Sequence, residues 1–247
     1  MMVLPPWTSS VLTIAAVNIG NYRGMGARYV NALFSGCARN LTLPFNFVCL
    51  TDDANGLRPE IKPQLLERGL VPQHLHPVYW KLALFRPGAF REDERVLFMD
   101  LDIVILSNID DIASYDGPFA MVREPYFPAE LNSSIMTFRP RHCDLWTKWV
   151  SDGFPEHRVA EQGWIADRLD NSAVRLQDVF PGRIRSFNID CRKLSPKPPT
   201  PMQQRLRTWH YRLFSVPYPH GASIVFFQGG LKPDNCKVPW VQDAWRG

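Results

Sequence analysis

The sequence predicts an α/β fold in which a mostly parallel sheet lies between two layers of helices, with a mixed carboxyl-terminal half. Three observations predict it. Short apolar runs alternate with helical patterns up to about residue 120, which favours a parallel sheet flanked by helices. One of these runs ends in two acids, Asp100 and Asp102. After residue 120 strand-like runs follow without regular alternation, so we expect one domain over residues 1–247 with halves at about 11–120 and 121–235.

The first elements are predicted by composition and by glycine and proline positions. Residues 11–17 form an apolar, β-branched run that predicts a strand, and the glycine-punctuated residues 18–26 predict a loop leading into a helix at 27–37. Free N–H groups at such a helix start favour a phosphate or ribose. Residues 45–50 predict a second strand. Proline near the start and glycine at the end of residues 59–69 predict a second helix.

The remaining elements follow from the same patterns. Residues 79–85 predict a short helix before the strand at 96–99, and residues 108–112 predict a helical turn. Four prolines in residues 196–201 predict a surface loop. Further strands are expected at residues 119–122, 135–138 and 224–227, and further helices at residues 143–150 and 161–169.

Composition excludes several classes of protein. With 45% hydrophobic and 21% charged residues the chain is globular in composition, and no apolar stretch of about 18 residues is present that would span a bilayer. The start lacks the features of a signal peptide, so we expect a cytoplasmic protein, with peripheral membrane contact left open. The net charge of +4 is too small to indicate nucleic acid as a partner, although it suits an anionic substrate. The basic and aromatic residues 205–212 suggest stacking on a sugar or base.

The two acids after the strand at residues 96–99 predict where the chemistry lies, because α/β sheets bind ligands beyond the carboxyl ends of their strands. Carboxylates there suit Mg²⁺ or Mn²⁺, which bridge acids to nucleotide phosphates. Three interpretations are open: a solvated turn, a phosphatase in which Asp100 attacks phosphorus and Asp102 protonates the leaving group, and a nucleotide-sugar glycosyltransferase. A strand–helix–strand–helix–strand series precedes Asp100, whereas the phosphatase motif normally lies on the first strand. The glycosyltransferase is therefore favoured.

Several segments resemble, in the same order, motifs of glycogenin-like and lipopolysaccharide-galactosyltransferase-like retaining glycosyltransferases. The segment from Arg95 to Asp102, continued by residues 106–112, resembles their metal-site segment. The other similar segments are Val17-Asn18 with Tyr22, Tyr79-Trp80-Lys81-Leu82, Asn132-Ser133-Ser134-Ile135-Met136, Glu161-Gln162-Gly163, and Phe226-Phe227-Gln228-Gly229-Gly230-Leu231-Lys232-Pro233. The resemblance implies the GT-A fold, a three-layer α/β/α sandwich with a Rossmann-like sheet. It also implies transfer of a hexose from a nucleotide sugar, most simply a UDP-sugar, with retention.

The resemblance also implies roles for single residues and for the two halves of the chain. Residues 11–120 would bind the nucleotide, and residues 121–235 the donor sugar and an unknown glycan, lipid-linked or protein acceptor. Mn²⁺ or Mg²⁺ would be held by Asp100, Asp102 and Gln228. The implied catalytic residues are Glu161, Gln162 and Asn132. The implied nucleotide- and donor-binding residues are Asn18, Tyr22, Lys81, Asp100, Leu101, Ser133, Gly229 and Lys232.

The sequence departs from the family pattern at three places. Phe226 stands where glycogenin-like enzymes have a metal-ligating His, and Gln228 stands where bacterial relatives have one. Glu161 replaces the family's Asp and is one methylene longer, so an alternative reading makes Glu161 and Gln162 first-turn helix residues favoured by the dipole. Tyr22 lies one residue farther from Asn18 than in the family. A nucleotide-binding module without turnover therefore stays an alternative, as do front-face and covalent routes to retention.

Overall fold

The structure, a computed structural model, describes residues 11–140, 144–169, 172–193, 202 and 216–246. Two segments discussed above, the proline cluster at 196–201 and the basic and aromatic residues 205–212, lie outside the described residues. No helix in the described part of the chain is both long enough and apolar enough to cross a membrane.

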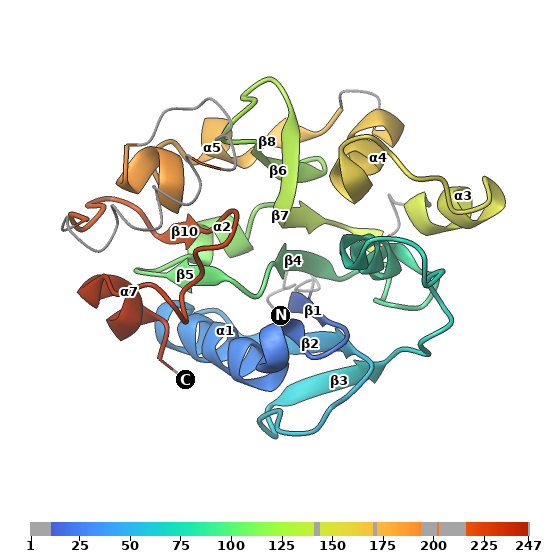
Figure 1. Cartoon of the computed structure of the whole chain (residues 1–247), viewed down its shortest axis with the longest axis horizontal. Coiled ribbons are helices and arrows are strands. Elements are labelled where there is room, and N and C mark those ends of the chain that lie inside the picture. Colours follow the sequence, from blue (N-terminus) through green and yellow to red (C-terminus); the bar gives the residue numbers. More distant parts are fainter. Residues whose placement is uncertain (1–10, 141–143, 170–171, 194–201, 203–215, 247) are drawn as a thin grey trace, which may run out of the picture.

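A seven-stranded sheet runs through the centre of the molecule in the order β3-β2-β1-β4-β7-β6-β8 (Figure 1). β7 is antiparallel to both β4 and β6, whereas the other neighbouring pairs are parallel. The strands of this sheet are β1 (Leu12–Asn18), β2 (Phe45–Thr51), β3 (Ile61–Leu65), β4 (Arg95–Met99), β6 (Ala120–Arg123), β7 (Leu131–Phe138) and β8 (Val174–Arg175).

A second, three-stranded sheet has the order β5-β10-β9. Its strands are β5 (Ile103–Ile105), β9 (Ile184–Ser186) and β10 (Ile224–Phe226). β10 is antiparallel to β5 and parallel to β9, so Phe226 pairs with both Ile103 and Ser186. The segment directly after the acidic pair is therefore fixed against the carboxyl-terminal part of the chain.

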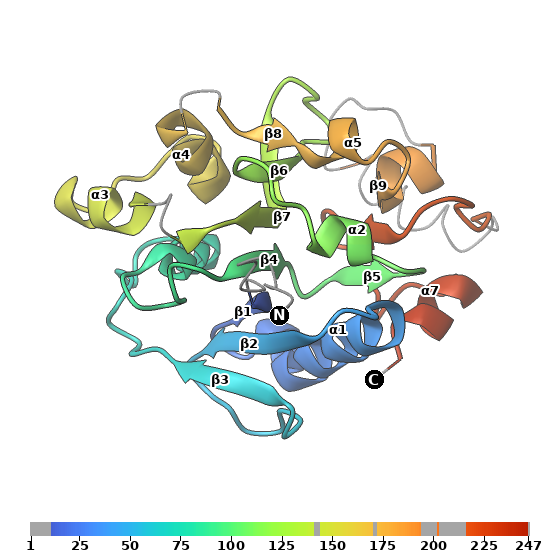
Figure 2. The same cartoon turned by 180° about the vertical axis from the view of Figure 1, so that it is seen from behind.

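Helices and the small sheet cover both faces of the large sheet (Figures 1 and 2). The helices are η1 (Tyr22–Gly24), α1 (Gly26–Asn40), η2 (Pro77–Phe85), α2 (Asp110–Ala113), α3 (Leu145–Ser151), α4 (Ala160–Arg168), α5 (Leu176–Val179), η4 (Phe187–Cys191) and α7 (Pro239–Ala244). Alternate residues of β4 belong to two cores. Leu97 and Met99 pack with α1, α7 and the small sheet, and Val96 and Phe98 pack with η2, α3 and α4.

Most of the predicted elements are confirmed within a few residues, including the antiparallel strand that makes the second half mixed. The helix predicted at residues 59–69 is wrong, since this segment contains strand β3. β3 lies at the sheet edge, where Pro63 is tolerated because an edge strand does not need every N–H for a ladder. Ile61 is buried on the sheet, whereas Leu65 is exposed. Proline and glycine at the two ends therefore mark a short edge strand.

The fold gathers several strand ends at one edge. β1 and β4 are parallel, so Asn18 and the acids after Met99 lie at the same edge. Since β7 runs the opposite way, its amino-terminal residues come to that edge too, and the amide of Asp100 donates to the carbonyl of Ser134 over 2.8 Å. β6 runs antiparallel to β7 and therefore ends there. The pairing of Phe226 with Ile103 and Ser186 adds the ends of β9 and β10.

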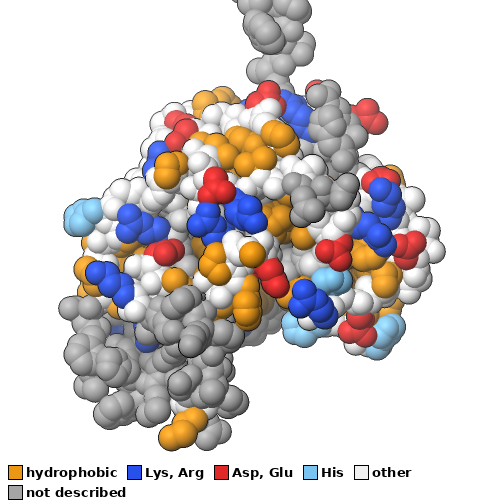
Figure 3. All heavy atoms as spheres, turned by 90° about the horizontal axis from the view of Figure 1, so that it is seen from above, with side chains coloured by type: hydrophobic (Ala, Val, Ile, Leu, Met, Phe, Trp, Pro, Cys, Tyr) orange, Lys and Arg blue, Asp and Glu red, His pale blue; other side chains and the backbone are white. Residues whose placement is uncertain are grey.

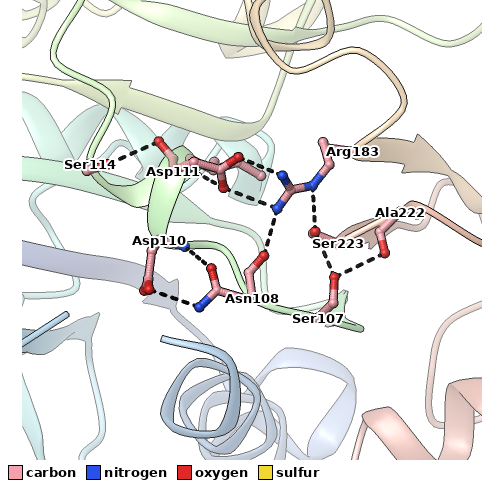
Figure 4. A network of polar contacts seen from close by, with 9 residues as sticks. Ser107, Asn108, Asp110, Asp111, Ser114, Arg183, Ala222 and Ser223 are labelled. Atoms are coloured by element: carbon pink, nitrogen blue, oxygen red, sulfur yellow. Dashed lines mark hydrogen bonds and ion pairs between the residues drawn. The ribbon is translucent and has the colours of Figure 1, made fainter. Parts of the chain in front are cut away.

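Arg183, directly before β9, binds the segment that follows β5 and contains α2, and it also binds Ser223, directly before β10 (Figure 4). Its guanidinium donates to both carboxylate oxygens of Asp111, over 2.6 and 3.1 Å, and to the carbonyl of Asn108 and the hydroxyl of Ser223, each over 2.8 Å. The carbonyl of Arg183 accepts from the amides of Ser223 and Ile224. This planar, multiply bonded geometry suits an arginine and not a lysine.

Charged side chains of both signs are interspersed on the face shown in Figure 3. Basic groups in the described part of that face do not form a large single-sign patch. This distribution agrees with the small net charge of the chain.

Replacing Arg183 with methionine should lower the free energy of unfolding by about 1–3 kcal/mol, because a charged, bidentate contact and two further hydrogen bonds are lost. Urea denaturation measures the change. Arg91, whose partner Asp93 is exposed and two residues away, gives the control: Arg91→Met should change stability by less than about 0.5 kcal/mol. Equal effects of the two substitutions would contradict the structural role of Arg183.

Candidate functional site

A cavity of about 490 Å³ opens at the edge where the strand ends meet. One part of its wall is apolar and includes Val17, Ile19, Pro77 and Val78. The other part is charged and carries the acids and lysines that the sequence singled out. The residues of this charged part are Lys81, Asp100, Asp102 and Lys232, with Tyr22, Arg23 and the backbone of Leu101 beside them.

Lys81, from η2, is the centre of one charged group. Its ammonium lies 2.8 and 2.9 Å from the two carboxylate oxygens of Asp100 and 3.4 Å from the carboxylate of Glu161. It also donates to the hydroxyl of Ser133 over 3.0 Å, and that hydroxyl donates to Glu161 over 2.6 Å. One cation therefore joins the first acid of the Asp-Leu-Asp segment to α4 and β7.

Burial and the neighbouring opposite charges shift each of the pKa values of Asp100 and Lys81 in opposite directions. Burial raises the pKa of Asp100 to about 6, with Lys81 acting in the opposite direction and Asp102 adding to the rise. Burial alone would lower the pKa of Lys81, but the carboxylates of Asp100 and Glu161 outweigh it and the pKa is raised. Lys81 therefore stays charged, while Asp100 is the group whose ionisation is costly.

Asp102 forms a second pair, with Lys232. The side chain of Asp102 is 7% exposed and that of Lys232 is 14% exposed, so the pair is largely shielded from water. The loop that carries Lys232 is held by Asn235, whose side-chain carbonyl accepts from the Lys232 amide over 2.8 Å. Gly229, in the same loop, has a left-handed φ of 70°, which a glycine adopts without strain.

The two carboxylates suit a divalent cation as well as the lysines. Mg²⁺ and Mn²⁺ are commonly held by one or two carboxylates, with waters and phosphate oxygens completing the shell. Among the described residues no group of three or more His, Cys, Asp and Glu is placed to hold a metal. Asp100 and Asp102 offer two carboxylates to such an ion, which would take the rest of its shell from water and substrate.

Gln228, expected as a third ligand, is turned elsewhere. Its side-chain carbonyl accepts from the hydroxyl of Ser186 over 2.8 Å, and its amide nitrogen is buried without a hydrogen-bond partner among the described residues. Gln228 lies outside the lining of the 490 Å³ cavity. In this arrangement its oxygen is already used, so the metal role of Gln228 stays a prediction that requires the contact with Ser186 to break.

Glu161 lies in the first turn of α4 but is only 2% exposed. Its contacts with Lys81 and Ser133 disfavour the reading of a solvated first-turn acid. Gln162, the next residue, is half-buried. Lys81 links Glu161 to Asp100, and neither Glu161 nor Gln162 belongs to the lining of the 490 Å³ cavity.

Asn132 lies at the start of β7, behind Ser133. Its amide nitrogen donates to Glu124 over 2.7 Å, and its carbonyl accepts from the amide of Ser134 over 2.8 Å. Glu124 is 8% exposed, and no sequence signal singled it out. Its proximity to Asn132 follows from the register of β6 and β7, which the sequence does not reveal.

Asn18 and Tyr22 are joined by a hydrogen bond from the Tyr22 amide to the Asn18 side chain over 3.2 Å. A side chain at Gly26 would collide with Asn18, so the start of α1 needs this glycine. The first amide of α1, at Gly26, donates to the side chain of Asn21 over 2.7 Å and is not free for a phosphate. Tyr22 lines the cavity, and burial together with the nearby Asp102 and Asp100 raises its pKa.

A second cavity, of about 600 Å³, lies at the ends of β6, β9 and β10. Glu124, Ser186 and Phe226 belong to its lining. Asn132 contacts Glu124 of this cavity, while its neighbour Ser133 contacts Lys81 of the first. The two cavities are therefore separated by the first residues of β7.

No protein-family model matches the chain, and no curated protein matches it significantly. Solved structures do. A structure of an active-site mutant of LgtC is 12% identical, with a TM-score of 0.63, and the match covers 94% of this chain and 93% of that one. The galactosyltransferase LgtC in complex with donor and acceptor sugar analogs is 13% identical, with a TM-score of 0.58 over the same shares of both chains.

Two larger proteins contain the same fold. The glycosyltransferase GlyE of Streptococcus pneumoniae TIGR4 is 13% identical, with a TM-score of 0.59, over 96% of this chain and 59% of that one. The bifunctional WbbM is 12% identical, with a TM-score of 0.61, over 98% and 52%. The chain has the GT-A fold of these proteins, as the sequence resemblance implied.

Replacing Lys81 with methionine should destabilise the protein, because Asp100 and Glu161 would face each other without a cation. Removing one partner of a buried ion pair costs about 3–5 kcal/mol, and we expect a loss near the lower end in metal-free urea titrations at pH 8. Lys148, exposed and one turn from Asp144, is the control. Lys148→Met should change the free energy of unfolding by less than about 0.5 kcal/mol.

The loss caused by Lys81→Met should shrink in acid. The pKa of Asp100 in the folded protein, about 6, lies above its ordinary 3.8. Ionisation of Asp100 therefore opposes folding, and its contribution to stability falls as the pH rises from about 4 to about 6 and is constant above. Below pH 6 the carboxyl group of Asp100 is mostly neutral, so the loss of the Lys81 ammonium costs less stability there. A cost of Lys81→Met that is the same at pH 5 and pH 8 would contradict this coupling.

Proposed function

We propose that this protein is a glycosyltransferase that transfers a hexose from a nucleotide sugar, most simply a UDP-sugar, to an acceptor with retention. One observation carries the proposal. In a chain with the GT-A fold, the Asp-Leu-Asp segment follows the central strand β4 and lines a cavity together with two lysines. Carboxylates, cations and an apolar wall in one cavity suit a ligand with a diphosphate and a base.

The apolar wall supports binding of a nucleobase. Val17, Ile19 and Pro77 offer an apolar surface, and Tyr22 lies beside them in the same cavity. Tyr22 packs edge-on against Tyr29 with ring centroids 5.0 Å apart, which fixes the orientation of its ring. Asn18 holds the backbone of Tyr22. We assign Asn18 and Tyr22 to the base and ribose.

The balance of charge supports a divalent ion at Asp100 and Asp102. Four carboxylates, those of Asp100, Asp102, Glu161 and Asp234, face three cations, Lys81, Lys232 and Arg23. The contacts therefore sum to about one excess negative charge, and a diphosphate would add at least two more. Mn²⁺ or Mg²⁺ bound there would supply positive charge to the diphosphate as it leaves.

Lys232 and Lys81 would act on different parts of the donor. Lys232 pairs with Asp102. Turning from that carboxylate to the β-phosphate would place a cation on the oxygen that gains charge as the glycosidic bond breaks, which is commonly the largest catalytic effect. Lys81 is held from three sides by Asp100, Glu161 and Ser133, so it would stay in place and orient the donor sugar.

The groups around the donor sugar suit positioning. The charge of Glu161 is already balanced by Lys81, and its carboxylate accepts from Ser133. A front-face route, in which the departing diphosphate assists the acceptor hydroxyl, needs no protein nucleophile and fits a balanced Glu161. The family resemblance implies catalytic roles for Gln162 and Asn132 and donor contacts for Leu101 and Gly229, and of these four Leu101 lines the cavity in this arrangement.

The 600 Å³ cavity supports an acceptor site. It lies across the start of β7 from the donor cavity, and Glu124 presents a buried carboxylate to it. Prolines at 125, 128 and 181 supply apolar surface. Carboxylates that accept from hydroxyl groups, combined with flat apolar surface, are typical of carbohydrate sites. We assign this cavity to the acceptor.

Donor hydrolysis tests the function against its two alternatives. The purified chain is incubated with a panel of nucleotide sugars and Mn²⁺, and release of the nucleoside diphosphate is measured. The proposal expects release from at least one donor. Hydrolysis of a generic phosphoester without sugar-donor cleavage would favour the phosphatase, and donor binding without release would favour a module without turnover.

Replacing Asp102 with asparagine should weaken Mn²⁺-dependent binding of UDP by about tenfold or more, since one of two carboxylate ligands is lost. Calorimetry with and without Mn²⁺ measures the change. Gln228→Ala should leave the affinity unaltered, because the Gln228 side chain is engaged with Ser186. A loss of Mn²⁺ affinity in Gln228→Ala equal to that in Asp102→Asn would show that the Gln228 oxygen is a ligand after all.

Replacing Glu124 with glutamine should reduce transfer to an acceptor more than donor hydrolysis by water. The amide keeps the shape and can still accept from Asn132, but its nitrogen would face the Tyr126 amide, which donates to the other Glu124 oxygen over 3.2 Å, and it lacks the charge that binds acceptor hydroxyl groups. We expect the KM for acceptor to rise by about tenfold. Equal loss of transfer and hydrolysis would place Glu124 on the donor side.

A further inference from the structure

The loop between β1 and α1 has an unusual backbone. Four of its residues have left-handed φ angles, namely Gly20 (68°), Asn21 (54°), Arg23 (54°) and Gly24 (71°). For the two glycines this conformation costs little, but a residue such as arginine pays about 1 kcal/mol or more. Such strain persists where surrounding contacts fix the chain, and it is commonest at ligand sites.

Two side-chain contacts to backbone amides fix the loop. Asn21 accepts from the amide of Gly26, and Asn18 accepts from the amide of Tyr22. The result is that the side chain of Arg23 joins the lining of the donor cavity, together with Asp102 and Lys232. The strained backbone therefore brings a cation to the charged part of that cavity.

Asp234 holds this cation loosely. One nitrogen of Arg23 lies 3.4 Å from Asp234, and the arginine side chain is 33% exposed. Asp234 also accepts from the hydroxyl of Tyr29, so it keeps a hydrogen bond if Arg23 turns away. An arginine has five N–H donors in a planar fork, and a single long contact leaves most of that capacity for a ligand.

We propose that Arg23 is a diphosphate-binding residue that selects nucleoside diphosphates over monophosphates, which deepens the function proposed above and rests on it. Lys81 and Lys232 each neutralise an acid of the Asp-Leu-Asp segment. Arg23 comes from the amino-terminal loop and Lys232 from the carboxyl-terminal one, so the two cations approach the same cavity from separate segments. The planar guanidinium binds phosphate oxygens in pairs, a geometry that an ammonium lacks.

Calorimetry on the full chain with Mn²⁺ tests the proposal with four probes: UDP, UMP, uridine and inorganic pyrophosphate. Arg23→Met should lower the affinity for UDP and for pyrophosphate by about tenfold and the affinity for UMP by less. The affinity for uridine should not change. Arg28→Met is the matched control. Arg28 lies on α1, where its guanidinium stacks on Trp245 at 5.0 Å, and its loss should leave all four affinities unaltered.

Two further variants distinguish a diphosphate-binding role of Arg23 from a purely structural role in the loop. Arg23→Lys keeps the charge but loses the planar guanidinium, so its affinity for UDP should lie between that of Arg23→Met and that of the unaltered chain. Asp234→Asn leaves Arg23 in place and should retain most of the UDP affinity of the unaltered chain. If Asp234→Asn weakens UDP as much as Arg23→Met, or if Arg23→Met weakens all probes equally, Arg23 only braces the loop and the proposal is overturned.

The probes also separate this inference from the function on which it rests. If the unaltered chain binds UDP and Arg23→Met binds it equally well, the role of Arg23 is refuted and the donor site stands. If the chain binds pyrophosphate but not UDP, the choice of a uridine donor is wrong, and the pyrophosphate affinity of Arg23→Met still decides the role of Arg23. Failure to bind any of the four would overturn both.

Discussion

Balance of charge at one edge of the sheet is the constraint on which the rest of the site depends. Asp100, Asp102 and Glu161 are held close together in a region shielded from water, where unpaired carboxylates would be costly. Lys81 and Lys232 make that arrangement possible. Lys81 lies 19 positions before Asp100 and Lys232 lies 130 positions after Asp102, so the placement of η2 and of the loop around Lys232 brings each cation to its acid.

The direction of β7 explains how one edge can carry so many polar groups. In a sheet of parallel strands alone, only carboxyl ends would reach this edge. Because β7 is reversed, its first residues reach it as well, and Ser133 and Asn132 contact residues that line the 490 Å³ and the 600 Å³ cavity respectively. The mixed sheet thus places the residues that follow β4 beside the first residues of β7.

The sequence predicted five of the seven strands of the large sheet, β1, β2, β4, β6 and β7, because buried strands of four to eight residues leave a clear pattern. It missed β5, β9 and β10 as one sheet, since their register depends on pairing between distant segments. It misread β3 because proline and glycine bound edge strands as well as helices. Among site residues, Lys81, Glu161 and Ser133 are in contact with one another, and the roles that the family resemblance implies for them stay predictions. Arg23, Asp234 and Glu124 were missed, because nothing local distinguishes a loop arginine or a strand-end glutamate from a solvated one.

The pairing of Asp102 with Lys232 spans 130 positions of the chain. During synthesis the acidic segment therefore leaves the ribosome long before the lysine that neutralises it has been made. Until then the nascent chain can form the strands around Asp102 but must keep that carboxylate in water, so the edge stays open. The cavity is complete only once the segment around Lys232 has been made, so the order of translation itself delays the moment at which this cavity first forms.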